Sequence, residues 1–408
     1  MSHRSVIVAI FVALSTIAFV SQGEAVSTHP IIVIFGFDGF RYDYLKRGLN
    51  PVLKDITERG VSTDFLMNVF PTKTFTNFFS IATGMYAEAH GVLANKVFSE
   101  NGTCLKYSYE MFHYNEDIVP IWTLNEKTGE GRHSGCMMWP GCDYPYQNIN
   151  LTYFQKYNNT IKWTDRIDMM MTWLLDPEKP MNLLNAYFEQ PDAIGHAFGP
   201  YSEKTNEKLK QVDEILLYFF EKLNQQPELK DRINLIVLSD HGMVEIKTDK
   251  IINISALMDP ETYTKCGDSP VIQILPKPGF EDAIYQNLTL SAQNNKTFKI
   301  YKKEEMPDFW YWKNNRRNIG LYAASNPCYS FDDNPTQKGN HGYVPGLKNM
   351  RAFFTAIGPI FRQPTHVTWL HNIDIYPLIS YVLKLESPPE HVKPNGTLAK
   401  IKYILKDD

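Results

Sequence analysis

The sequence predicts an α/β fold in which a mostly parallel central sheet is covered by helices on both faces. Uninterrupted apolar runs, such as residues 31–37 and 235–238, are typical of strands that are buried on both sides. Segments with apolar side chains at helical spacing lie between such runs. This alternation of strand and helix indicates a parallel sheet with helical connections.

The N-terminal half begins with the strand at 31–37, followed by a predicted helix at 50–59 that ends at Gly60. A second helix is predicted at 75–82, between the segment Pro-Thr-Lys-Thr and Gly84. The clearest long helices are predicted at 165–175 and 203–223. The last of these carries apolar residues at helical spacing: Leu209, Val212, Ile215, Leu216, Phe219, Phe220 and Leu223.

The pattern changes to short strands and a helix at about 245–325, which we interpret as a small α+β cap inserted over the main sheet. The main fold resumes near Met350 with an apolar run and a helix at 373–383. No linker, low-complexity run or internal repeat divides the 408 residues. We therefore expect one large domain at 26–408 that contains the cap.

Residues 1–25 are predicted to be a secretory signal peptide. His3 and Arg4 precede an apolar stretch at 6–20, and small residues precede the expected cleavage site after Ala25. The alternative, an N-terminal membrane anchor, is disfavoured because a spanning helix needs roughly 20 apolar residues. No other run is long enough to span a membrane, so the mature chain is expected to be secreted.

Two further features agree with export. Seven Asn-x-Ser/Thr sequons predict N-glycosylation at surface positions: Asn101, Asn150, Asn158, Asn253, Asn287, Asn295 and Asn395. Five cysteines suit an oxidising compartment but leave one without a partner: Cys104, Cys136, Cys142, Cys266 and Cys328. Their pairing is not deducible from the sequence. The net charge of −4, without a basic patch interleaved with aromatic residues, gives no indication of a nucleic-acid partner.

Metal-binding side chains stand where apolar runs end. Asp38, Asp192 and Asp240 each lie just beyond such a run, and His241 follows Asp240 directly. Ligands of open α/β sheets bind beyond the carboxyl ends of the strands. Three strands could therefore build one site from distant parts of the chain. We expect Gly242 to supply the backbone freedom that two adjacent ligands need.

Two more histidines complete the candidate metal centre. His196 lies four residues after Asp192, so both would point the same way from a helical turn. His341 stands in the flexible segment Gly-Asn-His-Gly-Tyr. An isolated aspartate and histidine four residues apart are more often a surface pair than a metal site. Here, however, three aspartates and three histidines form two sets of three nitrogen and oxygen ligands. Such sets suit two Zn²⁺ ions with open positions, which at roughly 4 Å apart would hold both oxygens of an in-line phosphoryl displacement.

A candidate hydroxyl nucleophile, Thr74, stands at the predicted start of the helix at 75–82. Taken alone, it could equally be the N-cap of that helix.

Seven motifs follow one another across nearly the whole mature chain: FGFDGFR (35–41), FPTKTFTN (70–77), TGMYAEAHGV (83–92), FEQPDAIGHAFGP (188–200), LSDHGM (238–243), GNHGY (339–343) and NIDIYPL (372–378). In content and order they resemble the ecto-nucleotide pyrophosphatase/phosphodiesterase family of the alkaline-phosphatase superfamily. The chain is similar to the short, single-domain members of that family, because it lacks the cysteine-rich modules and the nuclease-like domain of the larger ones.

The resemblance implies a role for each candidate residue. One zinc, which activates the nucleophile, would be held by Asp38, Asp240 and His241. Thr74 would itself coordinate this zinc, attack the phosphorus and form a phospho-threonine intermediate. A position at a helix N-terminus would also favour the incoming phosphate.

The second zinc would bind the phosphate and later the attacking water, and would be held by Asp192, His196 and His341. The resemblance further implies that the amide of Asn95 helps to hold a phosphate oxygen.

The same resemblance implies a nucleotide substrate. Phe75 and Tyr157 match an aromatic pair that stacks on a nucleobase, worth about 1–3 kcal/mol per stack. Trp139 and Asp143 match a segment of the nucleotide-cleaving members that lysophospholipid-cleaving relatives lack. Without the resemblance, these aromatic residues would be interpreted as ordinary core side chains.

Three positions depart from the family pattern without removing a metal ligand. Thr76 stands where proline is common, Asn340 replaces an acidic residue beside His341, and Cys142 replaces a serine or threonine.

The sequence therefore predicts a secreted two-zinc phosphodiesterase that cleaves extracellular nucleotides or dinucleotides to nucleoside 5′-monophosphates. A choline-phosphate or lysophospholipid diesterase on the same scaffold is one alternative. An inactive extracellular binding protein is another.

Overall fold

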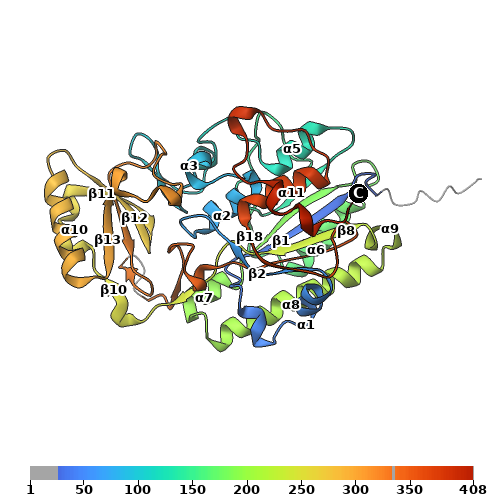
Figure 1. The fold of residues 1–408 in the computed structure, drawn as a ribbon, viewed down its shortest axis with the longest axis horizontal. Coiled ribbons are helices and arrows are strands. Elements are labelled where there is room, and N and C mark those ends of the chain that lie inside the picture. The colour runs from blue at the N-terminus through green and yellow to red at the C-terminus, as the bar shows by residue number, and fades with distance from the viewer. Residues whose placement is uncertain (1–25, 333–335, 408) are drawn as a thin grey trace, which may run out of the picture.

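The computed structural model describes residues 26–332 and 336–407. Its centre is an eight-stranded sheet with the strand order β18-β2-β17-β8-β1-β7-β5-β6 (Figure 1). In that order the strands are Thr365–His371, Val61–Met67, Phe354–Ile357, Ile233–Leu238, Ile31–Phe37, Leu183–Phe188, Ser134–Met137 and Tyr153–Gln155. The expected signal peptide lies outside the described residues.

The sheet is mostly parallel, as the sequence predicts. β1 pairs in parallel with β7 on one side and with β8 on the other, and all three strands are fully buried. β17 is the exception, because it runs antiparallel to both β8 and β2. The apolar run near Met350 predicts a strand there, but a short buried run carries no information about its direction.

Helices cover both faces of the sheet, with α1 and α8 on one side and α2, α5 and α11 on the other (Figure 1). Their bounds are Pro51–Arg59 for α1, Glu203–Asn224 for α8, Thr74–Thr83 for α2, Ile121–Thr128 for α5 and Ile375–Val382 for α11. The predicted helix at 165–175 is α6, Trp163–Leu174. The expected α/β architecture is therefore present.

A second, antiparallel sheet forms a separate layer at one end of the molecule (Figure 1). Its order is β11-β12-β14-β13, with bounds Tyr263–Asp268, Val271–Pro276, Leu321–Ser325 and Phe298–Lys302. Helix α10, Glu281–Asn295, packs on it and contributes Ile284 and Leu288 to a core of its own. We propose that about 245–325 is a cap within a single domain at 26–408.

The cysteines form two disulfides in this structure. Cys104 pairs with Cys266 and so joins the cap to the main body, Cys136 pairs with Cys142, and Cys328 is exposed and free. All seven sequon asparagines are exposed. Among residues 26–332 and 336–407, no helix combines the length and the apolar character needed to cross a membrane.

Candidate active site

Three neighbouring strands deliver the three aspartates to one edge of the main sheet. Asp38 directly follows β1, Asp240 lies two residues beyond β8, and Asp192 is the first residue of α7, Asp192–Phe198, shortly after β7. Because β8, β1 and β7 are adjacent and parallel, their carboxyl ends lie side by side. The backbone N–H of Asp192 also donates to the carbonyl of Asp38 at 3.0 Å, which ties two of the connections together.

The first expected ligand set surrounds His241. Its Nε2 lies 2.9 Å from Asp240 Oδ2 and 3.3 Å from Asp38 Oδ1. The hydroxyl of Thr74 lies 3.2 Å from the same nitrogen. The structure therefore brings the candidate nucleophile and all three expected ligands of this set together around one point.

The second expected set surrounds Asp192. Its two carboxylate oxygens lie 3.4 Å from His196 Nε2 and 3.5 Å from His341 Nε2. The rings of His341 and His241 stack with their centroids 3.5 Å apart, so the two sets are in contact. Asp192 also lies close enough to Asp38 and His241 for these three to share a cation.

The three imidazoles share one arrangement. In each, Nδ1 lies against a backbone carbonyl: that of Gly339 for His196 at 2.8 Å, Gly242 for His241 at 3.0 Å and Thr72 for His341 at 2.8 Å. Donation from Nδ1 leaves Nε2 as an acceptor, which is the form of imidazole that binds metal. All three Nε2 atoms face carboxylates.

Carboxylate oxygens and imidazole acceptors this close repel one another unless a cation or a proton lies between them. Asp38 Oδ1, Asp192 Oδ1 and Asp240 Oδ2 are buried and accept no hydrogen bond. Burial, together with the charges of Asp192 and Asp240, raises the pKa of Asp38 well above its ordinary value. Divalent cations would reverse this penalty, and the nitrogen and oxygen donors suit zinc. The residues present therefore fit the metals that the sequence predicts.

Thr74 is the first residue of α2, and the N-cap position is occupied by Lys73, whose side chain makes no capping hydrogen bond. The alternative of Thr74 as the N-cap is therefore wrong. Lys73 instead donates from Nζ to the carbonyl of Ser269 in the cap at 2.6 Å. This leaves the Thr74 hydroxyl directed at His241, at the positive end of α2.

Asn95 lies beside the start of α2, where its Oδ1 accepts the backbone N–H of Phe75 at 2.9 Å. With the amide oxygen held in this way, the NH₂ group is turned away from that N–H. Asn95 is thus fixed next to the residue that follows Thr74.

The expected base-binding aromatics lie on the surface near this edge. Phe75 is half-buried and packs edge-on against Tyr107 at 5.2 Å between ring centroids. Tyr157 is exposed, and its ring lies 6.1 Å from that of Tyr187. Asp143 accepts a hydrogen bond from the Tyr107 hydroxyl.

Trp139 is placed differently from the other three expected substrate residues. Its side chain is fully buried, packs against Phe78 at 4.7 Å between ring centroids and donates from Nε1 to the Phe78 carbonyl at 3.2 Å. It therefore packs against α2 from the protein interior and presents no surface to a substrate in this structure.

Gly242 has a different role from the one expected. Its backbone is not left-handed; instead, a Cβ here would lie 2.1 Å from the carbonyl oxygen of Asn349. Close packing of two chain segments, rather than freedom of φ, requires glycine beside His241.

Two residues that hold the ligands in place are not apparent from the sequence. Tyr187, in the buried strand β7, donates its hydroxyl to Asp38 Oδ2 at 2.6 Å. The Thr72 hydroxyl accepts the N–H of Gly342 at 3.0 Å and donates to the carbonyl of Tyr343 at 2.9 Å, which fixes the loop that carries His341. A tyrosine in an apolar strand and a threonine in a loop carry no sequence signal that separates them from ordinary core residues.

Comparisons with known proteins place the chain in a family. A family model described as type I phosphodiesterase / nucleotide pyrophosphatase matches residues 32–344. The chain is 35% identical over 390 residues to a bis(5′-adenosyl)-triphosphatase of Xenopus laevis, covering 93% of this chain and 82% of that protein. It is 33% identical over 384 residues to ectonucleotide pyrophosphatase/phosphodiesterase family member 5 of Homo sapiens, covering 92% of this chain and 78% of that protein.

Solved structures show the same similarity. The structure of murine ectonucleotide pyrophosphatase/phosphodiesterase 5 matches with a TM-score of 0.85 at 33% identity, covering 92% of this chain and all of that one. A complex of the murine protein with AMP, in an inactive variant that carries a threonine-to-alanine substitution, matches with a TM-score of 0.85 at 32% identity, covering 93% of this chain and 100% of that one. The expected family resemblance and fold are thus confirmed.

Proposed function

Because the chain belongs to the type I phosphodiesterase / nucleotide pyrophosphatase family, we propose that it is a secreted, N-glycosylated two-zinc enzyme that releases nucleoside 5′-monophosphates from extracellular nucleotides. The activity of the class, hydrolysis of phosphodiester or pyrophosphate bonds, follows from the family itself. The zinc ions, the threonine intermediate and the substrate are our proposal.

One observation carries it: three aspartates, each with a buried oxygen that accepts no hydrogen bond, face three imidazole Nε2 atoms next to the Thr74 hydroxyl. Asp38, Asp240 and His241 would hold one zinc, and the other would be held by Asp192, His196 and His341. Bound zinc would supply the positive charge that favours the threonine alkoxide and offsets the charge of the phosphate.

The side chains then have separate tasks. Thr74 Oγ attacks the phosphorus attached to the nucleoside 5′ oxygen, and the bond from that phosphorus to the leaving phosphate breaks. Water next cleaves the bond between Thr74 Oγ and phosphorus, which releases the nucleoside monophosphate and restores the hydroxyl. Asn95 would donate its amide NH₂ to a phosphate oxygen, and the N-terminus of α2 would favour the negative charge.

The substrate proposal depends on the aromatic residues. A nucleobase between Phe75 and Tyr157 would fix the nucleoside end, so the phosphorus nearest the nucleoside is the one that reaches Thr74. Two relatives support a nucleotide: one is named for bis(5′-adenosyl) triphosphate, and the murine structure contains AMP. Asp143 would act at the edge of this pocket through Tyr107, and Trp139 through α2.

Product analysis tests the proposal. ATP is expected to give AMP and pyrophosphate, and bis(5′-adenosyl) triphosphate is expected to give AMP and ADP. In ¹⁸O-labelled water the label is expected on AMP, because water attacks the phosphorus that Thr74 carries. Formation of ADP and labelled free phosphate from ATP would refute the proposal that Thr74 attacks the phosphorus nearest the nucleoside. Faster turnover of a lysophospholipid than of any nucleotide would instead support the lipid diesterase alternative.

A further inference from the structure

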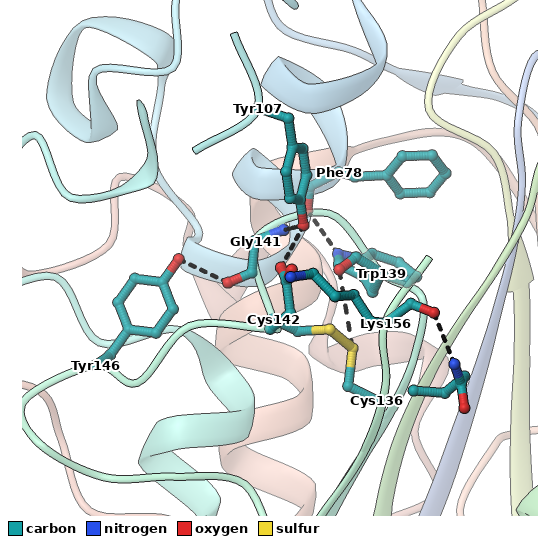
Figure 2. The surroundings of a disulfide bond; sticks show 10 residues. Phe78, Tyr107, Cys136, Trp139, Gly141, Cys142, Tyr146 and Lys156 are labelled. Atoms are coloured by element: carbon teal, nitrogen blue, oxygen red, sulfur yellow. Dashed lines mark hydrogen bonds between the residues drawn. A yellow bond between two sulfur atoms is a disulfide. The ribbon is translucent and has the colours of Figure 1, made fainter. Parts of the chain in front are cut away.

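A short covalent ring lies directly behind the expected base pocket. The Cys136–Cys142 disulfide joins the end of β5 to the turn at 139–142, and both cysteines are buried (Figure 2). Two residues inside the ring, Met138 and Gly141, have left-handed backbones with φ of 63° and 87°. Such a conformation costs free energy for a residue with a Cβ, here Met138. The disulfide therefore helps to hold the backbone in this conformation.

The ring presents the backbone N–H and carbonyl of one residue, Gly141, to two tyrosines. Tyr107 accepts the N–H of Gly141 at 3.0 Å, and Tyr146 donates its hydroxyl to the Gly141 carbonyl at 2.9 Å (Figure 2). Tyr107 also donates to Asp143, the residue directly after Cys142. Burial and the Asp143 carboxylate raise the pKa of Tyr107 above its ordinary value, so its hydroxyl keeps its proton for that bond. Both hydrogen-bond partners of the Tyr107 hydroxyl therefore lie at the C-terminal end of the ring, Gly141 just inside it and Asp143 just outside it.

The Tyr107 ring in turn fixes the position of Phe75. The two rings pack edge-to-face with centroids 5.2 Å apart, and Phe112 packs against both, at 5.0 Å from Tyr107 and 6.0 Å from Phe75. Phe112 also leaves no room for a side chain at Gly141, where a Cβ would lie 2.8 Å from its ring. The contacts thus run without a break from the disulfide to Phe75.

We propose that the Cys136–Cys142 disulfide and Tyr107 are specificity-determining positioning elements, which hold Phe75 in the orientation that stacks on a nucleobase. The inference rests on the proposed function, because it assumes a nucleotide substrate. It goes beyond that function because it assigns affinity for the base to a disulfide. The family pattern has serine or threonine at the position of Cys142 and so cannot form this bond. The contact path ends at the ring of Phe75, which would stack on the base, and not at the hydroxyl of its neighbour Thr74, so the constraint is expected to act mainly on binding of the base.

Kinetics on two substrates test this assignment. Bis(5′-adenosyl) triphosphate carries a base, whereas bis(p-nitrophenyl) phosphate carries none. The pair Cys136→Ala/Cys142→Ala and the single change Tyr107→Phe are each expected to raise KM for the dinucleotide about fivefold, as loss of one net hydrogen bond does, with kcat within about twofold. The kinetics of the aryl substrate are expected to change by less than about twofold. The three changes combined are expected to have no larger effect than the cysteine pair alone, because they act through one contact path.

The second disulfide provides a matched control. Cys104→Ala/Cys266→Ala removes a bond of the same kind that leads to the cap instead of Phe75, and it is expected to leave the ratio of the two KM values unchanged. Tyr107→Phe keeps both disulfides, so the inference can be tested even where the cysteine pair fails to fold.

Each outcome decides between the two proposals. If the wild type shows no preference for a base-bearing substrate, the proposed function fails and the inference fails with it. If the wild type prefers the dinucleotide but Tyr107→Phe leaves its KM unchanged, only the inference is overturned. Equal losses on both substrates would also overturn it, since they would mean that the disulfide merely supports the fold.

Discussion

At the scale of single residues, Thr74 differs from helical threonines such as Thr83 and Thr128, because its hydroxyl makes no bond to the preceding turn. Thr83 and Thr128 donate to the carbonyls four residues earlier, at 2.7 and 2.9 Å. Thr74 is the first residue of its helix and has no such carbonyl within the helix. Its oxygen is therefore free to face His241.

We expect Thr74→Ala to lower kcat by about 10⁴-fold or more while zinc stays bound, because the change removes the attacking oxygen but none of the six aspartate and histidine ligands. Thr74→Ser keeps a hydroxyl and is expected to retain partial activity. Steady-state kinetics and metal analysis of the same samples check both statements. A Thr74→Ala enzyme with the wild-type rate would rule out the covalent mechanism.

His241→Ala and His341→Ala are each expected to lower zinc content by about one ion per chain, because a three-ligand site reduced to two loses both geometry and affinity. Elemental analysis of purified protein measures this. His366 is exposed on the far edge strand β18, so His366→Ala serves as the control and should retain two ions. An active wild type that carries no zinc after prolonged chelation would contradict the assignment of both sites.

At the scale of elements, local signals predict some boundaries well. The predicted start of α8 is correct because Ser202 caps it, accepting the N–H of Thr205. For α1 the cap comes from elsewhere: Asp213 of α8 accepts the N–H groups of Val52 and Leu53 at 3.1 and 2.9 Å. Such a partner, some 160 residues away, leaves no local trace in the sequence.

The strands that the sequence does not reveal are those of mixed burial. β18 is only partly buried and lies at the edge of the sheet, so its apolar side chains neither alternate cleanly nor form a run. The candidate ligands are predictable because aspartate and histidine are conspicuous where a buried strand ends. The Nδ1 partners of the histidines are backbone carbonyls, which any residue could supply, so their contribution appears only in the structure.

Gly242, in the connection from β8 to β17, allows a test of close packing beside His241. Gly242→Ala places a Cβ 2.1 Å from the Asn349 carbonyl and 2.8 Å from Arg41 Cγ, so backbone next to His241 must move. We expect a loss of about 1–3 kcal/mol in the free energy of unfolding, together with weaker zinc binding. Urea unfolding and zinc titration measure the two effects. At Gly346 a Cβ would meet nothing within 4 Å, so Gly346→Ala should change neither quantity.

At the scale of the whole molecule, the cap is held to the main body by bonds of several kinds. Cys104 and Cys266 join them covalently, Lys96 pairs with Asp268 beside that bond at 2.5 Å, and Arg317 donates to the carbonyl of Gly91 at 2.9 Å. The Lys73 contact with the Ser269 carbonyl extends this attachment to the N-terminus of α2. The cap is thus fixed at the edge of the sheet where the candidate ligands lie.

The two disulfides should therefore differ in what they contribute. Cys104 and Cys266 lie 162 residues apart, whereas Cys136 and Cys142 lie six apart. Loop-closure entropy of the unfolded chain predicts a loss of about 5 kcal/mol in unfolding free energy without the long-range bond and about 2 kcal/mol without the short one. Urea unfolding of the two alanine pairs, followed by tryptophan fluorescence, measures the difference, with Cys328→Ala as the neutral control. Since the long-range bond does not touch Phe75 or a candidate ligand, its loss should lower stability while the folded fraction keeps its kcat and KM. The opposite order of stabilities would mean that strain within the folded ring, and not chain entropy, governs these bonds.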